Sequence, residues 1–209
     1  MKKEKVFSSF GIMPKEEMLE VKPDFKQLNI GVPKESSFQE NRVSLTPDSV
    51  GLLVANGHSV ILEKGAGIAS NFSDKEYVDK GAVLVYSKKE VFKSNFILKI
   101  EPPTEEELAL MNNSQQLISA VQMSTQTADY FNTLNKKNIT AFGFEFIQDK
   151  QKKLPFVRIM SEIAGNTAML IAGEYLSTVN KGKGLMLGGI SGLTPTSVVV
   201  IGAGTVGEY

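Results

Sequence analysis

The sequence predicts an α/β fold built on a mostly parallel β-sheet. Short apolar segments with strand character alternate with helical segments of about ten residues along most of the chain. Turns rich in Gly, Asn and Pro separate them, and neither an internal repeat nor a low-complexity segment interrupts the alternation. This order is typical of βαβ units, in which each helix crosses between two parallel strands.

The first helix carries the clearest signals of its own limits. Thr46 is a favourable N-cap and Pro47 follows at the first helical position. Gly57 stands where the helix is expected to end. Later helices carry comparable signals, among them the capping-box spacing of Thr104 and Glu107. The expected helices cover residues 46–57, 73–81, 88–94, 104–111 and 124–138.

Six strands are expected before, between and after these helices. The first is short, apolar and stopped by Pro33, and the third is predicted to be a buried strand. The fourth ends in two prolines. The expected strands cover residues 28–33, 58–67, 82–87, 95–103, 116–121 and 139–146.

A change in composition over residues 148–155 marks a loop or a domain boundary, because this stretch is polar and basic and ends at a proline. Beyond it we expect a long, largely buried helix from near Ser161, a glycine-rich loop over 182–192, and an apolar strand at 198–201. The predicted division is a surface or disordered extension (1–27), an N-terminal domain (28–155), and a linker helix with the first strand of a second domain (156–209).

Composition and charge exclude several classes of function. Lys and Arg number 23, as do Asp and Glu, so this neutral chain of 209 residues has no electrostatic reason to bind nucleic acid. Without cysteine it can form neither disulfides nor thiolate metal sites. No stretch reaches the ~18 consecutive apolar residues of a membrane span, and no signal-peptide core is found near the start. The expected location is the cytoplasm, and the expected partner is a small-molecule substrate.

The most specific short motif lies at the end of the sequence. Residues 202–207 are Gly-Ala-Gly-Thr-Val-Gly, the G-x-G-x-x-G pattern of dinucleotide-binding sites, directly after an apolar run. In this pattern Gly202 permits a tight turn, Gly204 lets the backbone approach a pyrophosphate, and Gly207 lets helix and strand pack closely. The alternative is a glycine turn without a ligand. The predicted cofactor-binding residues are Gly202, Gly204, Thr205, Val206 and Gly207.

A second candidate site is the loop that follows the first strand. Lys34, Glu35, Glu40 and Arg42 fall at the carboxyl end of that strand, where α/β sheets bind their ligands. An arginine just before a capped helix can hold a carboxylate through two parallel hydrogen bonds. Arg42 is therefore a candidate carboxylate ligand, and the alternative is a solvated surface arginine.

Lys99 is the third candidate, because it lies in an otherwise apolar strand. Burying a lysine is costly without a partner, so its position predicts a charged neighbour or a catalytic role. The alternative is an exposed strand edge from which the side chain reaches solvent. His58, the only histidine, falls in a turn expected to face away from the ligand side, and the sequence shows no metal-binding cluster.

These segments together resemble one family, which comprises alanine dehydrogenases and nicotinamide nucleotide transhydrogenases, including the transhydrogenase α subunit. They follow one another in the family's order from about Leu28 to the end of the sequence, and this colinearity is more specific than any single motif. The matching segments are IGVPKES, ENRVSLTP, GHSVILEKGAG, GAVLV, FILKIEPP, GFEF, LPFVRIMSEIAG, GKGLMLGGISGLTP and VVVIGAGTVG.

The resemblance implies an NAD-dependent oxidoreductase that converts L-alanine and water to pyruvate and ammonium, with formation of NADH. It implies a Rossmann-like parallel sheet as the substrate domain, followed by the start of a truncated NAD-binding Rossmann domain. It also implies that Arg42 binds the substrate carboxylate, and that Lys99 binds substrate and takes part in catalysis. Members of the family form oligomers, so a homo-oligomer is expected at full length.

The sequence departs from the dehydrogenase pattern at two places. Those enzymes usually carry Lys-Val-Lys-Glu-Pro with the second lysine functional, whereas this chain has only Lys99, at the place of the first. Their catalytic histidine falls where this chain has Gln122 or Met123, and neither side chain can act as an acid or base near neutral pH. Transhydrogenase α subunits also lack that histidine. A transhydrogenase-like NAD(H)-binding role is therefore the alternative function, and a non-catalytic fragment is the second alternative.

The sequence ends two residues after Gly207, before the acidic residue that a dinucleotide fingerprint carries about 20 positions on. We therefore expect the N-terminal part of a longer enzyme, inactive by itself. NAD rather than NADP follows from the resemblance alone, because the discriminating position falls beyond Tyr209.

Overall fold

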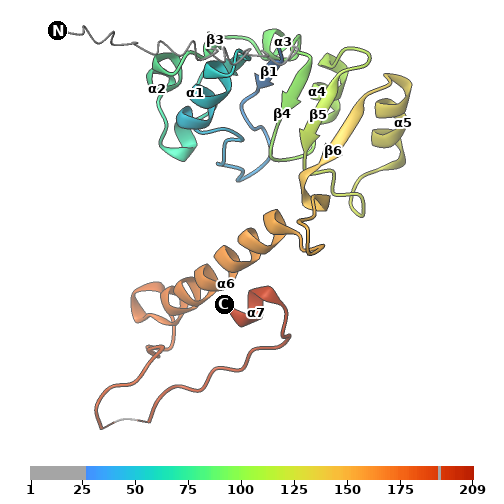
Figure 1. Ribbon diagram of the computed structural model, residues 1–209. Coiled ribbons are helices and arrows are strands. Elements are labelled where there is room, and N and C mark those ends of the chain that lie inside the picture. Colours follow the sequence, from blue (N-terminus) through green and yellow to red (C-terminus); the bar gives the residue numbers. More distant parts are fainter. Residues whose placement is uncertain (1–26, 193) are drawn as a thin grey trace, which may run out of the picture.

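The computed structural model describes residues 27–192 and 194–209. The predicted extension, residues 1–27, lies outside this part of the chain except for Gln27. A six-stranded sheet with helices around it occupies the first part, and a long helix followed by an irregular segment extends away from the sheet (Figure 1).

All six strands are parallel and follow the order β3-β2-β1-β4-β5-β6. Ile30 in β1 is opposite both Val60 in β2 and Phe96 in β4. After β3 the chain returns to the middle of the sheet, so the strand order reverses between β1 and β4. The predicted α/β class with a parallel sheet is confirmed. The strands are β1 (Asn29–Val32), β2 (Ser59–Glu63), β3 (Val83–Val85), β4 (Phe96–Leu98), β5 (Gln116–Ser119) and β6 (Thr140–Gly143).

Four of the five helices around the sheet begin where the sequence signals place them, whereas the fifth, expected from residue 124, begins at Ala128. Thr46 accepts a hydrogen bond from the Ser49 amide, and Thr104 forms a reciprocal capping box with Glu107. Such caps satisfy first-turn amides that have no partner within the helix. The helices are α1 (Pro47–Ala55), α2 (Asp74–Asp79), α3 (Lys88–Val91), α4 (Glu105–Leu110) and α5 (Ala128–Lys136).

Two clusters of buried side chains join these helices to the sheet. One lies around β1 and β2 and includes Tyr77 of α2, whose hydroxyl donates to the Leu45 carbonyl at 2.7 Å. The other lies around β4 and β5. Burial of each large apolar side chain contributes about 1.5–3 kcal/mol to the free energy of folding. The two clusters therefore hold the central strands β1 and β4 in place, together with the loops that follow them. The second cluster contains Val91, Phe92, Ile97, Leu108, Met111, Leu117, Tyr130 and Leu134.

The third strand differs from its prediction. Residues 82–87 were expected to form a buried strand, but β3 lies at the edge of the sheet and 53% of Val83 is exposed. The expectation was wrong because an apolar run fits a central and an edge strand equally well, and only the pairing decides between them.

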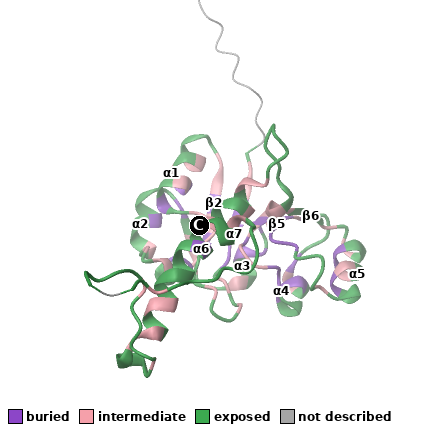
Figure 2. Ribbon diagram, turned by 90° about the horizontal axis from the view of Figure 1, so that it is seen from below, coloured by how far each residue is buried: buried purple, intermediate pink, exposed green. Residues whose placement is uncertain are grey.

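The segment after the sheet differs at two further places. Helix α6 (Pro155–Leu176) begins at Pro155 rather than near Ser161, and Gly165 is its only buried residue, so the prediction of a largely buried helix was wrong. Residues 198–201, expected to form a strand, have no regular secondary structure. Residues 198–201 are exposed, and Figure 2 shows most of α6 as exposed or half-buried. No described strand lies beside residues 198–201 to complete their backbone hydrogen bonds.

Candidate functional site

Charged side chains gather where the strand order reverses. The loop after β1 carries Glu35, Glu40 and Arg42, and the segment after β4 carries Lys99 and Glu101. Both segments leave the sheet at the same edge because β1 and β4 are parallel neighbours. Figure 1 shows the loop after β1 on the side of the sheet from which α6 extends. Open α/β sheets bind ligands at such a switch point, outside the carboxyl ends of the strands.

Lys99 is buried, with 1% of its surface exposed, and lies between two carboxylates. Its Nζ atom is 3.1 Å from Glu35 Oε2 and 3.0 Å from Glu107 Oε2. Both distances are short enough for ion pairs. The angles at Nζ do not meet the geometry of a hydrogen bond to either carboxylate. Of the two environments predicted for Lys99, the charged neighbours are therefore present and the exposed strand edge is not.

Glu107 joins this buried cluster to two further elements. Its Oε1 atom accepts from Lys88 Nζ at 2.8 Å and from Ser36 Oγ at 3.0 Å. Burial alone would raise the pKa of Glu107, but the charge of Lys99, with the hydrogen bonds from Lys88 and Thr104, holds that pKa below its ordinary value. The cluster thus ties the loop after β1 to α3, β4 and α4.

Arg42 is half exposed and is oriented by Glu40. Its Nε atom donates to Glu40 Oε1 at 2.9 Å, and its Nη2 atom donates to Glu40 Oε2 at 2.5 Å. The Glu40 side chain is only 8% exposed, against 51% for Arg42. Hydrogen bonds with Arg42 lower the pKa of Glu40, and the same pair raises the pKa of Arg42. The guanidinium is therefore fixed at the sheet edge with part of its surface open to solvent.

Glu101 faces Arg42 from the segment after β4. Its Oε1 atom is 3.6 Å from Arg42 Nη2, and its Oε2 atom accepts from Gln122 Nε2 at 2.8 Å. Gln122 is held in turn by its backbone amide, which donates to Glu145 Oε1 at 2.9 Å. We singled out Lys99 in this stretch from the sequence and missed Glu101 and Glu145. A carboxylate directly after a central parallel strand was the signal that could have pointed to Glu101.

The glycine motif forms a turn followed by a short helix. Gly202 has a φ of +106°, which favours glycine. A Cβ atom on Gly207 would lie 2.5 Å from the Gly202 carbonyl oxygen, whereas one on Gly204 would meet nothing within 4 Å. The short helix α7 (Thr205–Glu208) follows, with Gly204 at its N-cap. The turn and one helical turn of a dinucleotide fingerprint are thus formed, without the strand before them.

Helix α6 contacts both groups of predicted site residues. Arg42 Nη1 lies 3.4 Å from Met160 Sδ, and Gly165 packs so closely on α7 that a Cβ atom there would lie 2.5 Å from the Val206 carbonyl oxygen. The two helix positions are separated by a rise of about 7.5 Å along the axis. One segment of α6 therefore connects the sheet edge with the glycine motif.

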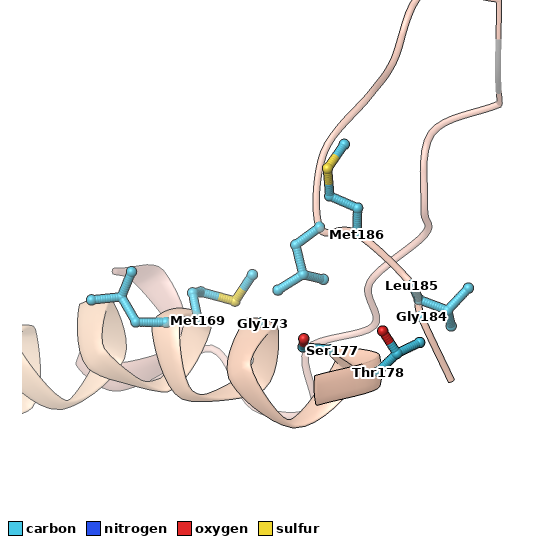
Figure 3. Close-up of a pocket in the computed structure, with 9 residues that line it drawn as sticks. Met169, Gly173, Ser177, Thr178, Gly184, Leu185 and Met186 are labelled. Atoms are coloured by element: carbon cyan, nitrogen blue, oxygen red, sulfur yellow. The ribbon is translucent and has the colours of Figure 1, made fainter. Parts of the chain in front are cut away.

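A surface pocket lies elsewhere, between the second half of α6 and the glycine-rich segment (Figure 3). Its lining has no charged side chain and none of the predicted site residues. It offers apolar contacts and the hydroxyls of Ser177 and Thr178, but no group suited to acid–base chemistry. The lining residues are Met169, Leu170, Gly173, Ser177, Thr178, Gly184, Leu185, Met186 and Leu187.

Other features fall away from the switch point. His58 lies just before β2, and its Nδ1 atom accepts from the Leu28 amide at 3.3 Å, so it lies at the opposite edge of the sheet, as predicted. Within residues 27–192 and 194–209, no group of three or more potential ligands is placed to hold a metal ion. None of the helices described there is both long and apolar enough to cross a membrane.

Two family descriptions match the chain in succession. "Alanine dehydrogenase/PNT, N-terminal domain" matches residues 31–164, and "Alanine dehydrogenase/PNT, C-terminal domain" matches residues 168–209. The chain belongs to the alanine dehydrogenase/PNT family. The resemblance drawn from the sequence segments is thereby confirmed.

Individual relatives are named alanine dehydrogenases. The chain is 40% identical over 179 residues to the protein from Methanococcus maripaludis, covering 85% of the chain and 48% of the relative. It is 35% identical over 178 residues to that from Bacillus subtilis, covering 85% and 47%. The chain therefore spans about half the length of the curated relatives it matches.

Solved structures show the same fold. An L-alanine dehydrogenase superposes with a TM-score of 0.81 at 36% identity, over 86% of this chain and 49% of that structure. A transhydrogenase from Sinorhizobium meliloti superposes with a TM-score of 0.64 at 23% identity, over 70% and 44%. The predicted Rossmann-like sheet is confirmed by the first match, and the second is a likeness of fold alone.

Proposed function

We propose that the protein is an NAD-dependent alanine dehydrogenase-like oxidoreductase, in which this chain supplies the substrate domain (28–155) and the start of the NAD-binding domain (156–209). The observation that carries the proposal is the position of Arg42. It is half exposed at the switch point and held by the nearly buried Glu40. Relatives named alanine dehydrogenase match 85% of the chain.

The geometry of Arg42 suits a carboxylate ligand. A guanidinium has five N–H donors, of which two go to Glu40 and one faces the weak acceptor Met160 Sδ. The remaining donors are available for the carboxylate of alanine or pyruvate. Lys99, by contrast, is committed to Glu35 and Glu107, so we assign it the positioning of the loop that carries Arg42.

The glycine motif fits NAD. The open space at Gly204 supports the approach of a pyrophosphate to the backbone, and the first-turn amides of Thr205 and Val206 would be its donors, as amides are at other helix N-termini. When bound, the cofactor accepts a hydride from the substrate carbon. We further propose that the full-length protein is cytoplasmic and that it forms a homo-oligomer. The exposed apolar residues of α6 support the second of these proposals.

A transhydrogenase-like NAD(H)-binding role is the second candidate. Gln122 and Met123 stand where the dehydrogenase pattern has its histidine, and both are exposed at the sheet edge without an acid–base group of their own. This observation favours a protein that binds NAD(H) without an amino-acid substrate.

The two roles are separated by assaying the complete gene product. Pyruvate plus ammonium should drive NADH oxidation, and Arg42→Ala should reduce kcat/KM for pyruvate by an amount equivalent to about 2–5 kcal/mol, because the carboxylate loses a charged partner. Lys93→Ala is the control, since Lys93 is exposed and precedes β4, away from the carboxyl ends of the strands, and it should leave kcat/KM unchanged. NADH binding measured by calorimetry, with no pyruvate-dependent rate, would support the transhydrogenase-like role instead.

A further inference from the structure

We propose that Glu101 is a specificity-determining residue that binds the ammonium group of a zwitterionic amino acid while Arg42 binds its carboxylate. This inference rests on the proposed function. It assigns a binding residue to the ammonium group of the substrate, which Arg42 does not bind. The proposal begins with the opposite charges of these two side chains, which lie in the segments that follow the adjacent strands β1 and β4.

The spacing of the two groups matches an α-amino acid. Glu101 Oε1 and Arg42 Nη2 are 3.6 Å apart, and both side chains are partly exposed, by 25% and 51%. The ammonium nitrogen and carboxylate of an α-amino acid are joined through one Cα and lie about 3 Å apart. A zwitterion can therefore lie beside both side chains, with each charge next to its opposite.

Glu101 also combines partial exposure with an oxygen that accepts no hydrogen bond, whereas the unpartnered oxygens of Glu35 and Glu145 are buried. Glu40 is committed to Arg42, and Glu35 to Lys99 and the Ile100 amide. Glu145 Oε1 accepts from two backbone amides. On Glu101, only Oε2 is hydrogen-bonded, by Gln122, and this bond aims the carboxylate and leaves Oε1 for an ammonium donor.

The net charge of the group favours a zwitterion over an anion. Arg42 contributes one positive charge, whereas Glu40 and Glu101 contribute two negative charges. A ligand that carries only a carboxylate gains Arg42 but is repelled by Glu101. An amino acid carries an ammonium that offsets this repulsion, and in the partly buried setting such pairs are weakly screened.

The test compares three probes of similar size on the complete gene product by calorimetry: L-alanine, propionate, which lacks the ammonium, and ethylamine, which lacks the carboxylate. The wild-type protein should bind L-alanine at least about tenfold more tightly than either other probe. Glu101→Gln keeps a partner for Gln122 but loses the charge, so it should bind L-alanine and propionate alike. Glu101→Lys should reverse the order and favour propionate.

Glu105→Gln is the control, because Glu105 is an exposed residue at the start of α4, and it should keep the wild-type order. Unfolding temperatures of the variants show whether each is folded, and the two Glu101 variants give independent readings. Equal affinities for L-alanine and propionate in the folded wild-type protein would overturn the inference even if pyruvate-driven NADH oxidation is observed. A preference for L-alanine that depends on Glu101 supports the inference. If pyruvate-driven NADH oxidation is absent in the same protein, that absence counts against the proposed activity and not against the role of Glu101.

Discussion

Two four-residue segments from apolar stretches of the sequence, 29–32 (Asn-Ile-Gly-Val) and 198–201 (Val-Val-Val-Ile), have opposite outcomes in this molecule. Asn29–Val32 forms β1 at the centre of the sheet, and Val32 is fully buried. Residues 198–201 have no regular structure, and Ile201 is 98% exposed. The first run pairs with β2 and β4, whereas no described strand lies beside the second. An apolar run becomes a strand only where neighbours complete its backbone hydrogen bonds.

The same contrast holds for the larger regions around these runs. Residues 29–143 contain both buried clusters, so their helices and strands cover one another. Helix α6 packs on α7 but leaves much of its apolar surface open, and apolar surface of this kind marks contacts with further protein. The sheet region therefore contains both buried clusters, whereas the apolar side chains of residues 155–209 are mostly exposed or half-buried among the residues that the structure describes. The exposed large apolar residues of α6 are Phe156, Ile159, Met160, Ile163, Met169, Leu170, Ile171 and Tyr175.

The largest expected effect comes from removing the cation at the centre of the sheet region. Lys99→Met leaves Glu35 and Glu107 buried without the charge between them. Breaking a buried ion pair in this way costs about 3–5 kcal/mol of unfolding free energy. Urea denaturation followed by circular dichroism should show this loss.

Lys93→Met is the matched control, since Lys93 is exposed close to the same strand, and its effect should stay within about 0.5 kcal/mol. Equal urea midpoints for the two variants would show that the buried cluster does not stabilise the sheet.

The next prediction compares the two regions by truncating one large apolar side chain to alanine in each. Leu62→Ala removes a fully buried side chain from the first cluster and should cost about 2–5 kcal/mol of unfolding free energy, because a cavity remains. Ile201→Ala removes a side chain that is 98% exposed and should cost less than about 0.5 kcal/mol. Urea midpoints measure both. A large loss for Ile201→Ala would show that residues 198–201 pack against something, contrary to the contrast drawn above.

The sequence was sufficient for the elements whose signals are local. Thr46 and Thr104 cap their helices as predicted, since an N-cap needs only residues one turn away. The parallel sheet followed from the alternation of strands and helices, because that order leaves few arrangements. Edge position and burial were not predictable for Val83 or α6, because both depend on which distant segments lie alongside.

The candidate site was predictable only in part for the same reason. Arg42 and Lys99 could be singled out from their positions after central strands, and the structure brings their segments together at one edge. Their partners could not be chosen, because Glu107 lies on α4 and Glu40 is one of several nearby carboxylates. The sequence shows which charges exist but not which of them are buried together, and burial determines which charge stays open to a ligand.

The smallest expected effect concerns acid stability of the sheet region. The folded state holds the pKa of Glu107 below its ordinary value of 4.5, so its carboxylate contributes stability above that pH and loses it as pH falls through the folded value. Only part of this stability is lost, because the ion pair between Lys99 and Glu35 remains when Glu107 is protonated. Glu107→Gln should lower the urea midpoint at pH 7, and its midpoint should fall less steeply below pH 4.5 than that of the wild-type protein. Glu106→Gln changes an exposed neighbour and should keep the wild-type slope, so a parallel fall in all three proteins would contradict the prediction.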